Sequence, residues 1–182
     1  IGCVGVVRVG ANMARRLKEH GYRIAAVQDH HATASQSLAL ELDSEAAASP
    51  ARVAELSDIV ITVVSDDAAM RDIYSEVDST SLMAHAKDRL FINCATLTPA
   101  LHIDIEQAVE RQGGAALEAC MASSITQARQ GTLYLMCGGK QNVFNRARPV
   151  LDSLGTIVRY IGPAGEAATV KALVNMVMNS NT

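Results

Sequence analysis

Short apolar runs alternate with amphipathic stretches along most of the chain. Residues 1–6 and 58–64 are continuous apolar runs rich in β-branched side chains, a pattern typical of strands buried on both faces of a parallel sheet. Residues 11–20 instead carry their apolar side chains at helical spacing, and Gly21 follows as a stop signal. Strands that alternate with helices of about ten residues predict an α/β fold with a doubly wound, mostly parallel sheet.

The remaining segments extend this alternation. Further strands are predicted at residues 22–28, 89–95, 115–120, 132–138 and 156–162. Further helices are predicted within 44–56, at 66–74 with Ser65 as the cap, between Thr98 and Gly113, and at 166–182. Pro149 interrupts residues 142–155, so we expect two short helices there rather than one.

The turn after the first strand has the spacing of a G-x-G-x-x-G phosphate-binding loop. Gly5 and Gly10 occupy the first and third glycine positions, and Val7 stands at the second, where the backbone normally approaches a diphosphate. If position 7 also needs an unusual φ, strain of about 1–3 kcal/mol would weaken binding roughly ten- to a hundredfold. The segment predicts either a nucleotide site or a plain strand–turn–helix.

An acidic residue follows the second predicted strand. Asp29 lies 19 positions after Gly10, where a carboxylate accepts the ribose hydroxyls and repels a 2′-phosphate, so it favours NAD over NADP. The alternative is a surface Asp in a turn. His30 and His31 come next, but no further ligands recur at metal spacing, so we expect a solvated pair and no metal site.

Composition narrows the class of protein. The 182 residues are 49% hydrophobic and 19% charged, with a net charge of −3, which suits one globular domain and provides no basic face for nucleic acid. No run reaches the length of a membrane span and no signal segment opens the chain, so we expect a cytoplasmic protein with no membrane partner. The four cysteines form no C-x-x-C pair and are expected to be reduced and mostly buried.

Several segments together resemble the β-hydroxyacid dehydrogenase family, the group of 3-hydroxyisobutyrate dehydrogenase, tartronate semialdehyde reductase and 6-phosphogluconate dehydrogenase. GVVRVGANMARRLKEHGY is similar to the family's opening G-L-G-x-M-G-x-x-M-A-x-x-L-x-x-x-G-[HY], and NCATLTP stands at its D-x-S-T-x-x-P. EACMASSITQARQGTLYLMCGG stands at its D-A-P-V-S-G-G segment, and GPAGEAATVKALVNM at its Gly-rich turn followed by K-x-x-[NH]-N. The order and spacing match from end to end.

This resemblance implies a domain organisation and a cofactor. Residues 1–162 would form a Rossmann-like NAD(P)-binding domain, and 163–182 would begin a helix leading to an all-helical domain that is absent here. Ile1 already lies within a strand pattern and the last helix has no stop signal, so we expect both ends to be cut. A homo-oligomer assembled through the helical domain is also implied. The implied cofactor contacts are Gly5, Val7, Val9, Gly10, Ala11, Asn12, Met13, Asp29, Val64, Ser65 and Thr96.

The resemblance also assigns the chemistry. Lys171 falls on the family's catalytic lysine and would exchange a proton with the substrate hydroxyl. Asn175, one turn later on the same helix face, would orient the lysine and the substrate. Without the resemblance, Lys171 is interpreted as a solvent-facing helix lysine, although its neighbours along the chain are apolar.

The predicted substrate loop departs from the family pattern. Ala122, Ser123 and Ser124 stand at the S-G-G that grips the substrate carboxylate, and a one-residue slip would let Ser123 supply the hydroxyl. The leading hypothesis is an NAD(P)-dependent dehydrogenase or reductase of a small 3-hydroxy acid or its semialdehyde. The alternatives are an imine-reductase-like enzyme, against which Lys171 argues, and a catalytically impaired member that acts as a nucleotide- or partner-binding protein.

Overall fold

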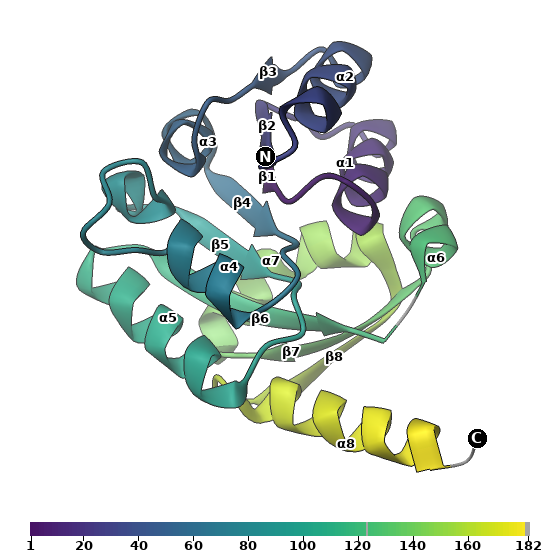
Figure 1. Cartoon of the computed structure of the whole chain (residues 1–182). Helices are drawn as coiled ribbons and strands as arrows, with labels where there is room; N and C mark the ends of the chain where they lie inside the picture. Colours follow the sequence, from purple (N-terminus) through teal and green to yellow (C-terminus); the bar gives the residue numbers. More distant parts are fainter. Residues whose placement is uncertain (123, 181–182) are drawn as a thin grey trace.

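The chain forms one sheet with helices on both faces (Figure 1). The computed structural model describes residues 1–122 and 124–180. Over these residues the sheet has eight strands in the order β3-β2-β1-β4-β5-β6-β7-β8. The strands are β1 (Gly2–Val4), β2 (Ala26–Gln28), β3 (Glu45–Ala46), β4 (Ile59–Thr62), β5 (Leu90–Asn93), β6 (Ala115–Met121), β7 (Leu133–Gly138) and β8 (Gly155–Gly162).

Among the described residues, each connection between consecutive strands contains a helix. The α-helices are α1 (Val9–Glu19), α2 (Ala32–Leu42), α3 (Pro50–Leu56), α4 (Asp67–Ile73), α5 (Pro99–Arg111), α6 (Ile125–Gln130), α7 (Gln141–Leu154) and α8 (Glu166–Ser180). A short 3₁₀ helix, η1 (Leu82–His85), precedes β5. This arrangement confirms the predicted doubly wound α/β fold.

The order of the strands reverses at β1. The chain moves from β1 to β2 on one side and crosses to β4 on the other, and all strands from β3 to β6 pair in parallel. Only the β6–β7 pair is antiparallel, which agrees with the expectation of a mostly parallel sheet. In such sheets a crevice forms beyond the carboxyl ends of the strands where the order reverses, which here lies between β1 and β4.

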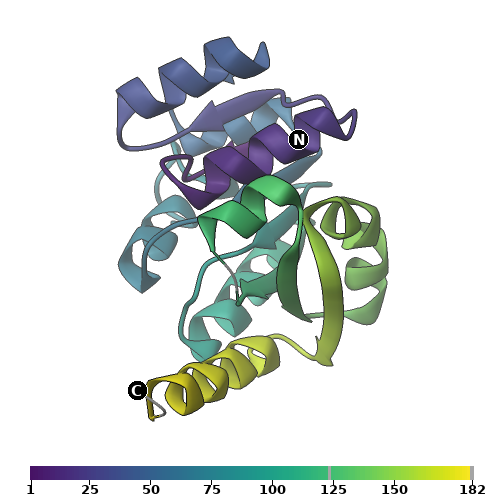
Figure 2. The same ribbon diagram turned by 90° about the vertical axis from the view of Figure 1, so that its right-hand side faces the viewer.

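Successive strand residues pack against opposite helical layers. Cys3 contributes to the core under α1, α2, α6 and α7, whereas Val4 contributes to the core under α3, α4 and α5. This explains why the central strands are continuous apolar runs. Helix α8 lies beside α5, against β6, β7 and β8, and α6 lies against α1 (Figures 1 and 2).

The first helix matches its prediction closely. Met13, Ala14 and Leu17 are buried in the core, as their spacing predicts. Gly21 adopts φ +85°, the left-handed conformation that lets the chain leave the helix without strain.

Helix α7 corrects a prediction. Pro149 lies inside a continuous helix, so the expectation of two short helices is wrong. Pro149 is exposed, and at such a position the carbonyl that loses its helical partner can bond to water. The buried stripe that includes Ala147 and Val150 runs past the proline on the other side of the helix. Packing of that stripe outweighs the local penalty of a proline.

The start of α4 also differs from prediction. The cap is Asp66, whose Oδ1 accepts the Ala69 N–H at 2.9 Å, and not Ser65. Ser65 donates its hydroxyl hydrogen to Asp66 Oδ2 at 2.9 Å, so it supports the cap from one residue earlier.

Two further observations bear on expectations from composition. Each of the four cysteines is buried and free. Within the described residues, none of the helices combines the length and the apolar character that crossing a bilayer requires.

Candidate active site

The turn between β1 and α1 requires both of its glycines, Gly5 and Gly10. Gly5 has φ +86°, and a Cβ at this position would overlap the Val63 carbonyl oxygen on β4's carboxyl side. A Cβ on Gly10 would overlap the Gly5 carbonyl oxygen across the turn. The first glycine therefore provides the sharp turn, and the third lets α1 approach the strand closely.

Val7 does not strain the turn. Among the described residues other than glycine, only Asp43 and Asp88 have positive φ, so the conditional strain cost at position 7 does not arise. The Val7 side chain is 51% exposed and lies on the wall of a cleft. Its methyl groups lie at the entrance of the cleft beside the turn, and the backbone at Val7 keeps a negative φ.

This cleft lies where the reversal of strand order predicts a ligand. It has a volume of about 280 Å³, and its walls come from the glycine turn, the end of β2 and the segment after β4. Its lining residues are Gly5, Val7, Arg8, Val9, Gly10, Asp29, His30, Val63, Val64, Ser65 and Ala69. Seven of the implied cofactor positions therefore meet at one cleft.

The amino end of α1 faces this turn. Arg8 is the N-cap residue, and its side chain makes no capping hydrogen bond to the first turn of the helix. Unpaired N–H groups and the positive end of the helix dipole suit an anion such as a diphosphate, and the exposed Arg8 side chain adds a charge at the cleft. The chemistry of the turn and its two required glycines fit a dinucleotide.

The other implied cofactor positions on α1 contribute in different ways. Ala11 and Met13 are buried in the core, so only their backbone is available near the turn. Asn12 donates from Nδ2 to the Arg8 carbonyl oxygen at 3.2 Å. Thr96, in the loop after β5, is exposed and lies outside the lining of the cleft.

Asp29 organises the turn from the end of β2. Its Oδ2 accepts the Val6 N–H at 2.7 Å, and its Oδ1 accepts the His31 N–H at 2.9 Å. His30 Nδ1 lies 3.1 Å from Oδ1, and both histidines are exposed. Because each carboxylate oxygen can accept about two bonds, Asp29 keeps acceptor capacity for a ribose while it anchors the loop.

A buried polar row crosses the sheet near its carboxyl edge. Thr62, Asn93 and Glu118 are register partners on neighbouring strands, so their side chains share a face, and Gly138 is the partner of Glu118 on β7. Thr62 and Tyr74 both donate to Asn93 Oδ1, at 2.8 and 2.7 Å. Burial raises the pKa of the Tyr74 hydroxyl, which keeps it a donor. These bonds tie the carboxyl ends of β4 and β5 to the end of α4.

Glu118 has an unexpected role for a residue on a central strand. Its Oε1 accepts the N–H groups of Ala167 (2.6 Å) and Ala168 (3.2 Å), and its Oε2 accepts that of Gly165 (3.0 Å). Burial raises the pKa of this carboxyl, while the three N–H bonds oppose that effect. His102 Nδ1 lies 3.7 Å from Oε2, and burial lowers the pKa of His102 to about 4.

Lys171 lies on the second turn of α8 and is only 9% exposed. Within the described residues, no carboxylate forms an ion pair with its ammonium. The positive charge of Lys171 acts on Cys120, which lies at the carboxyl end of β6. Asn175 is half-buried one turn later. The sequence alternative of a solvent-facing lysine therefore does not describe this side chain.

Lys171 and the glycine turn lie along the same edge of the sheet. From β1 to β6 there are three strand intervals, which span roughly 14 Å. That separation suits a ligand whose diphosphate lies over β1 and whose reactive ring lies near β6.

The predicted substrate loop is only partly described. Ser123 lies outside the described residues. Ala122 lies directly after β6, and its N–H bonds to the Tyr134 carbonyl oxygen of β7 at 3.1 Å, so its backbone is tied to the sheet. The Ser124 hydroxyl accepts the Gln127 N–H, and Gln127 Oε1 accepts the Ser124 N–H in return, which forms a capping box for α6. The Ser124 hydroxyl is thus already used to cap α6.

Sequence reasoning missed the roles of Glu118, His102 and Tyr74. No role is assigned to Glu118 from the sequence, although a charged residue inside the apolar strand 115–121 signals a buried partner. No local sequence pattern marks His102 or Tyr74 as a site residue. Their contacts come from strands and helices far apart in the sequence.

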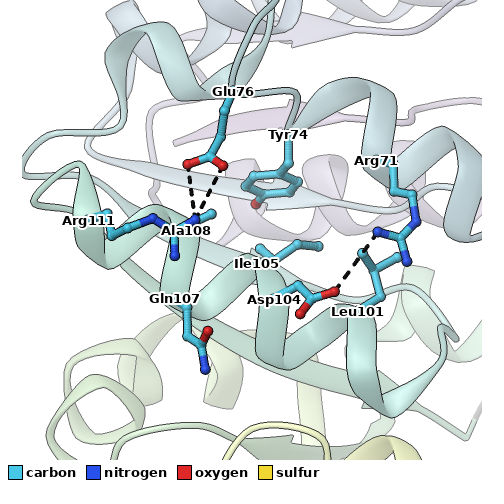
Figure 3. Close-up of a pocket in the computed structure, with 9 residues that line it drawn as sticks. All are labelled: Arg71, Tyr74, Glu76, Leu101, Asp104, Ile105, Gln107, Ala108 and Arg111. Carbon is cyan, nitrogen blue, oxygen red and sulfur yellow. Dashed lines mark hydrogen bonds and ion pairs between the residues drawn. The ribbon is translucent and has the colours of Figure 1, made fainter.

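A second hollow lies between α4 and α5 (Figure 3). It measures about 400 Å³, and none of the implied site residues lines it. Two exposed ion pairs border it, Arg71–Asp104 at 4.0 Å and Arg111–Glu76 at 3.1 Å. Because these charges already pair with one another, the cleft at the glycine turn remains the better candidate for a ligand.

Comparisons with known proteins agree with this geometry. A sequence family described as the NAD binding domain of 6-phosphogluconate dehydrogenase matches residues 1–162. The mitochondrial 3-hydroxyisobutyrate dehydrogenase of Rattus norvegicus is 29% identical over 178 residues, covering 98% of this chain and 52% of that protein. The NAD-dependent L-serine dehydrogenase of Pseudomonas aeruginosa is 28% identical over 179 residues, covering 98% of this chain and 59% of that protein. The chain spans about half the length of the curated relatives it matches.

Solved structures show the same fold. The 3-hydroxyisobutyrate dehydrogenase of Mycobacterium tuberculosis with L-serine gives a TM-score of 0.86 at 28% identity, covering 97% of this chain and 59% of that one. An imine reductase from Myxococcus stipitatus in complex with NADP⁺ gives 0.89 at 20% identity, covering 99% of this chain and 61% of that one. The second likeness concerns the fold alone.

Proposed function

Because the chain belongs to the family of the NAD-binding domain of 6-phosphogluconate dehydrogenase, we propose that it binds NAD(P) at the glycine turn and contributes Lys171 to the oxidation of a small 3-hydroxy acid or the reduction of its semialdehyde. One observation carries this proposal. The amino end of α1, which has no side-chain cap from Arg8, and a buried lysine with no carboxylate partner among the described residues lie along the same edge of the sheet. The substrate class follows from the names of the relatives.

Different residues would bind the cofactor and transfer the proton. The amides at the start of α1 and the Arg8 guanidinium hold the diphosphate, and Asp29 accepts hydrogen bonds from the ribose. When bound, the cofactor accepts a hydride from the carbon that carries the substrate hydroxyl. Lys171, as the neutral amine, takes the hydroxyl proton while that carbon becomes a carbonyl. In the reverse direction its ammonium returns the proton, and Asn175 hydrogen-bonds the substrate beside it.

Asp29 also supports a preference for NAD. Its carboxylate lines the cleft and would lie near a 2′-phosphate, which carries the same sign of charge. We propose the division of the chain on the same basis, with residues 1–162 as the cofactor domain and α8 as the start of a connecting helix.

Two measurements on the whole protein test this function. Calorimetric titration determines the dissociation constants of NAD and NADP, and the appearance of reduced nicotinamide reports turnover on 3-hydroxyisobutyrate, L-serine and other 3-hydroxy acids. Lys171→Ala should lower kcat by about 10²–10⁴-fold and leave the NAD dissociation constant unchanged. Lys87→Ala is the matched control, because Lys87 is exposed and its side chain lies outside the cleft. A Lys171→Ala variant with full activity would remove the assigned base.

A second candidate function is nucleotide binding without turnover. Two observations favour it: Val7 occupies the wall of the cleft where a glycine is usual, and the Ser124 hydroxyl is used as a helix cap. Tight NAD binding with no turnover on any hydroxy acid would support this candidate over the first.

A further inference from the structure

We propose that Glu118 is a positioning residue that fixes the start of α8 and thereby sets where Lys171 presents its amine at the edge of the sheet. The inference rests on the proposed function for the importance of Lys171, but the geometry of Glu118 stands independently of it. Glu118 is 3% exposed and belongs to β6, whereas the helix it holds begins 48 residues later, at Glu166.

The amide groups at the start of α8 are fully satisfied, and Glu118 satisfies most of them. Its carboxylate accepts three N–H groups, those of Gly165, Ala167 and Ala168. The Glu166 N–H bonds to the Pro163 carbonyl oxygen at 3.2 Å, and the Thr169 N–H bonds to that of Gly165 at 3.0 Å. A strand carboxylate therefore takes the place of the usual local N-cap, and its negative charge complements the helix dipole.

Gly138 makes room for this carboxylate. It pairs with Glu118 across the antiparallel β6–β7 ladder, and a Cβ on Gly138 would overlap Glu118 Oε1. Gly138 does not adopt positive φ, so its backbone accepts alanine. An alanine here would displace the carboxylate without removing any titratable group from the sequence.

His102 on α5 closes the other side of the carboxylate. Its Nδ1 lies 3.7 Å from Glu118 Oε2, beyond hydrogen-bond distance, and its side chain is 1% exposed. Neither ring nitrogen has a hydrogen-bond partner among the described residues. Glu118 is thus enclosed by the helix start, by Gly138 and by a buried imidazole, and these neighbours restrict where its carboxylate can lie.

The held amides lie on the same helix face as the lysine. Lys171 is four residues after Ala167 and three after Ala168, which places it one turn further along that face. Ala167 and Ala168 pack against Cys120, which follows Glu118 by two positions and so points from the same face of β6. One strand therefore holds the first turn of α8 through hydrogen bonds and the adjoining face through packing.

The test uses three variants with intact cysteines and lysines. Glu118→Gln keeps the shape but turns an amide donor toward the helix N–H groups, and Gly138→Ala displaces an unchanged carboxylate. Glu166→Gln is the matched control, because it removes an exposed carboxylate from the same helix turn. Circular dichroism confirms folding, and Gly138→Ala carries the test if Glu118→Gln does not fold.

Two readouts need no enzymatic activity. Hydrogen exchange of the amides at residues 165–168 should quicken by about tenfold in Glu118→Gln and Gly138→Ala. Acetylation of Lys171, read by mass spectrometry, should change several-fold, while Lys18, Lys87 and Lys140 in the same sample keep their rates because they are exposed. In Glu166→Gln neither readout should change.

Kinetics connect the positioning to the proposed reaction. In both test variants kcat should fall by about tenfold or more, because small displacements of a reacting group are costly, while the NAD dissociation constant stays unchanged. Unaltered Lys171 acetylation in both variants, or equal effects in Glu166→Gln, would overturn the proposal. If the wild type binds NAD but has no activity on any hydroxy acid, the proposed function fails, and the exchange and acetylation results still decide the role of Glu118.

Discussion

Acid should destabilise this protein through one buried histidine, His102. Burial lowers its pKa from 6.5 to about 4, with Asp67 acting in the opposite direction. Because the folded state binds this proton less readily than the unfolded state, the contribution to stability is complete above about pH 6.5. It is lost progressively as the pH falls to about 4. A pKa that is lower by about 2.5 in the folded state corresponds to about 3 kcal/mol of unfolding free energy, which we take as an upper limit.

The substitution His102→Leu isolates this effect. Neither ring nitrogen has a hydrogen-bond partner among the described residues, so leucine removes the titration without breaking a bond. Urea unfolding followed by circular dichroism should show the wild type losing up to about 3 kcal/mol more than the variant between about pH 6.5 and pH 4. At neutral pH the variant should be as stable as the wild type or more so.

The control separates His102 from the other titrating groups. Glu118 has a raised pKa, so its contribution changes with the opposite sign as the pH falls, and the difference between wild type and variant is the informative quantity. His20→Leu changes an exposed histidine and should leave the pH dependence unaltered. Equal losses of stability in wild type and His102→Leu would refute the reasoning.

Three further predictions follow from single contacts. Gly10→Ala should weaken NAD binding at least about a hundredfold in calorimetry, because the new Cβ meets the Gly5 carbonyl oxygen and opens the turn; an unchanged dissociation constant would contradict this. Asp29→Asn should lower the unfolding free energy by about 1–2 kcal/mol and weaken NAD binding. Asp29 accepts the Val6 and His31 N–H groups on different oxygens, and asparagine has only one side-chain oxygen. Pro149→Ala should raise the unfolding free energy by about 1 kcal/mol in urea titration, because the helix regains a backbone bond on its exposed side; destabilisation there would show that the proline is needed.

The elements that the sequence predicted well are those specified by local spacing. The buried face of α1 follows from the positions of Met13 and Leu17, and the glycine turn follows from Gly5 and Gly10. The strands of the parallel sheet follow from apolar runs, because burial on both faces removes any need for alternation.

The failures have a common physical cause. Whether Pro149 ends a helix depends on which side of the helix the core lies, and only the fold decides that. The cap of α8 comes from Glu118, a residue that no window around the helix contains. Likewise, the sequence alone left Lys171 as a solvent-facing residue, because its burial is produced by β6 and β7 packing beneath α8.

The central claim is that the amides between Gly5 and Gly10 hold the diphosphate of a dinucleotide although Val7 replaces a glycine. A crystal structure of the protein with NAD tests this most directly. The account predicts the diphosphate within hydrogen-bond distance of the first-turn amides of α1, with Val7 methyl groups beside it and the nicotinamide directed toward Lys171. Saturating NAD that leaves this cleft empty, or that binds in the hollow between α4 and α5, would contradict it.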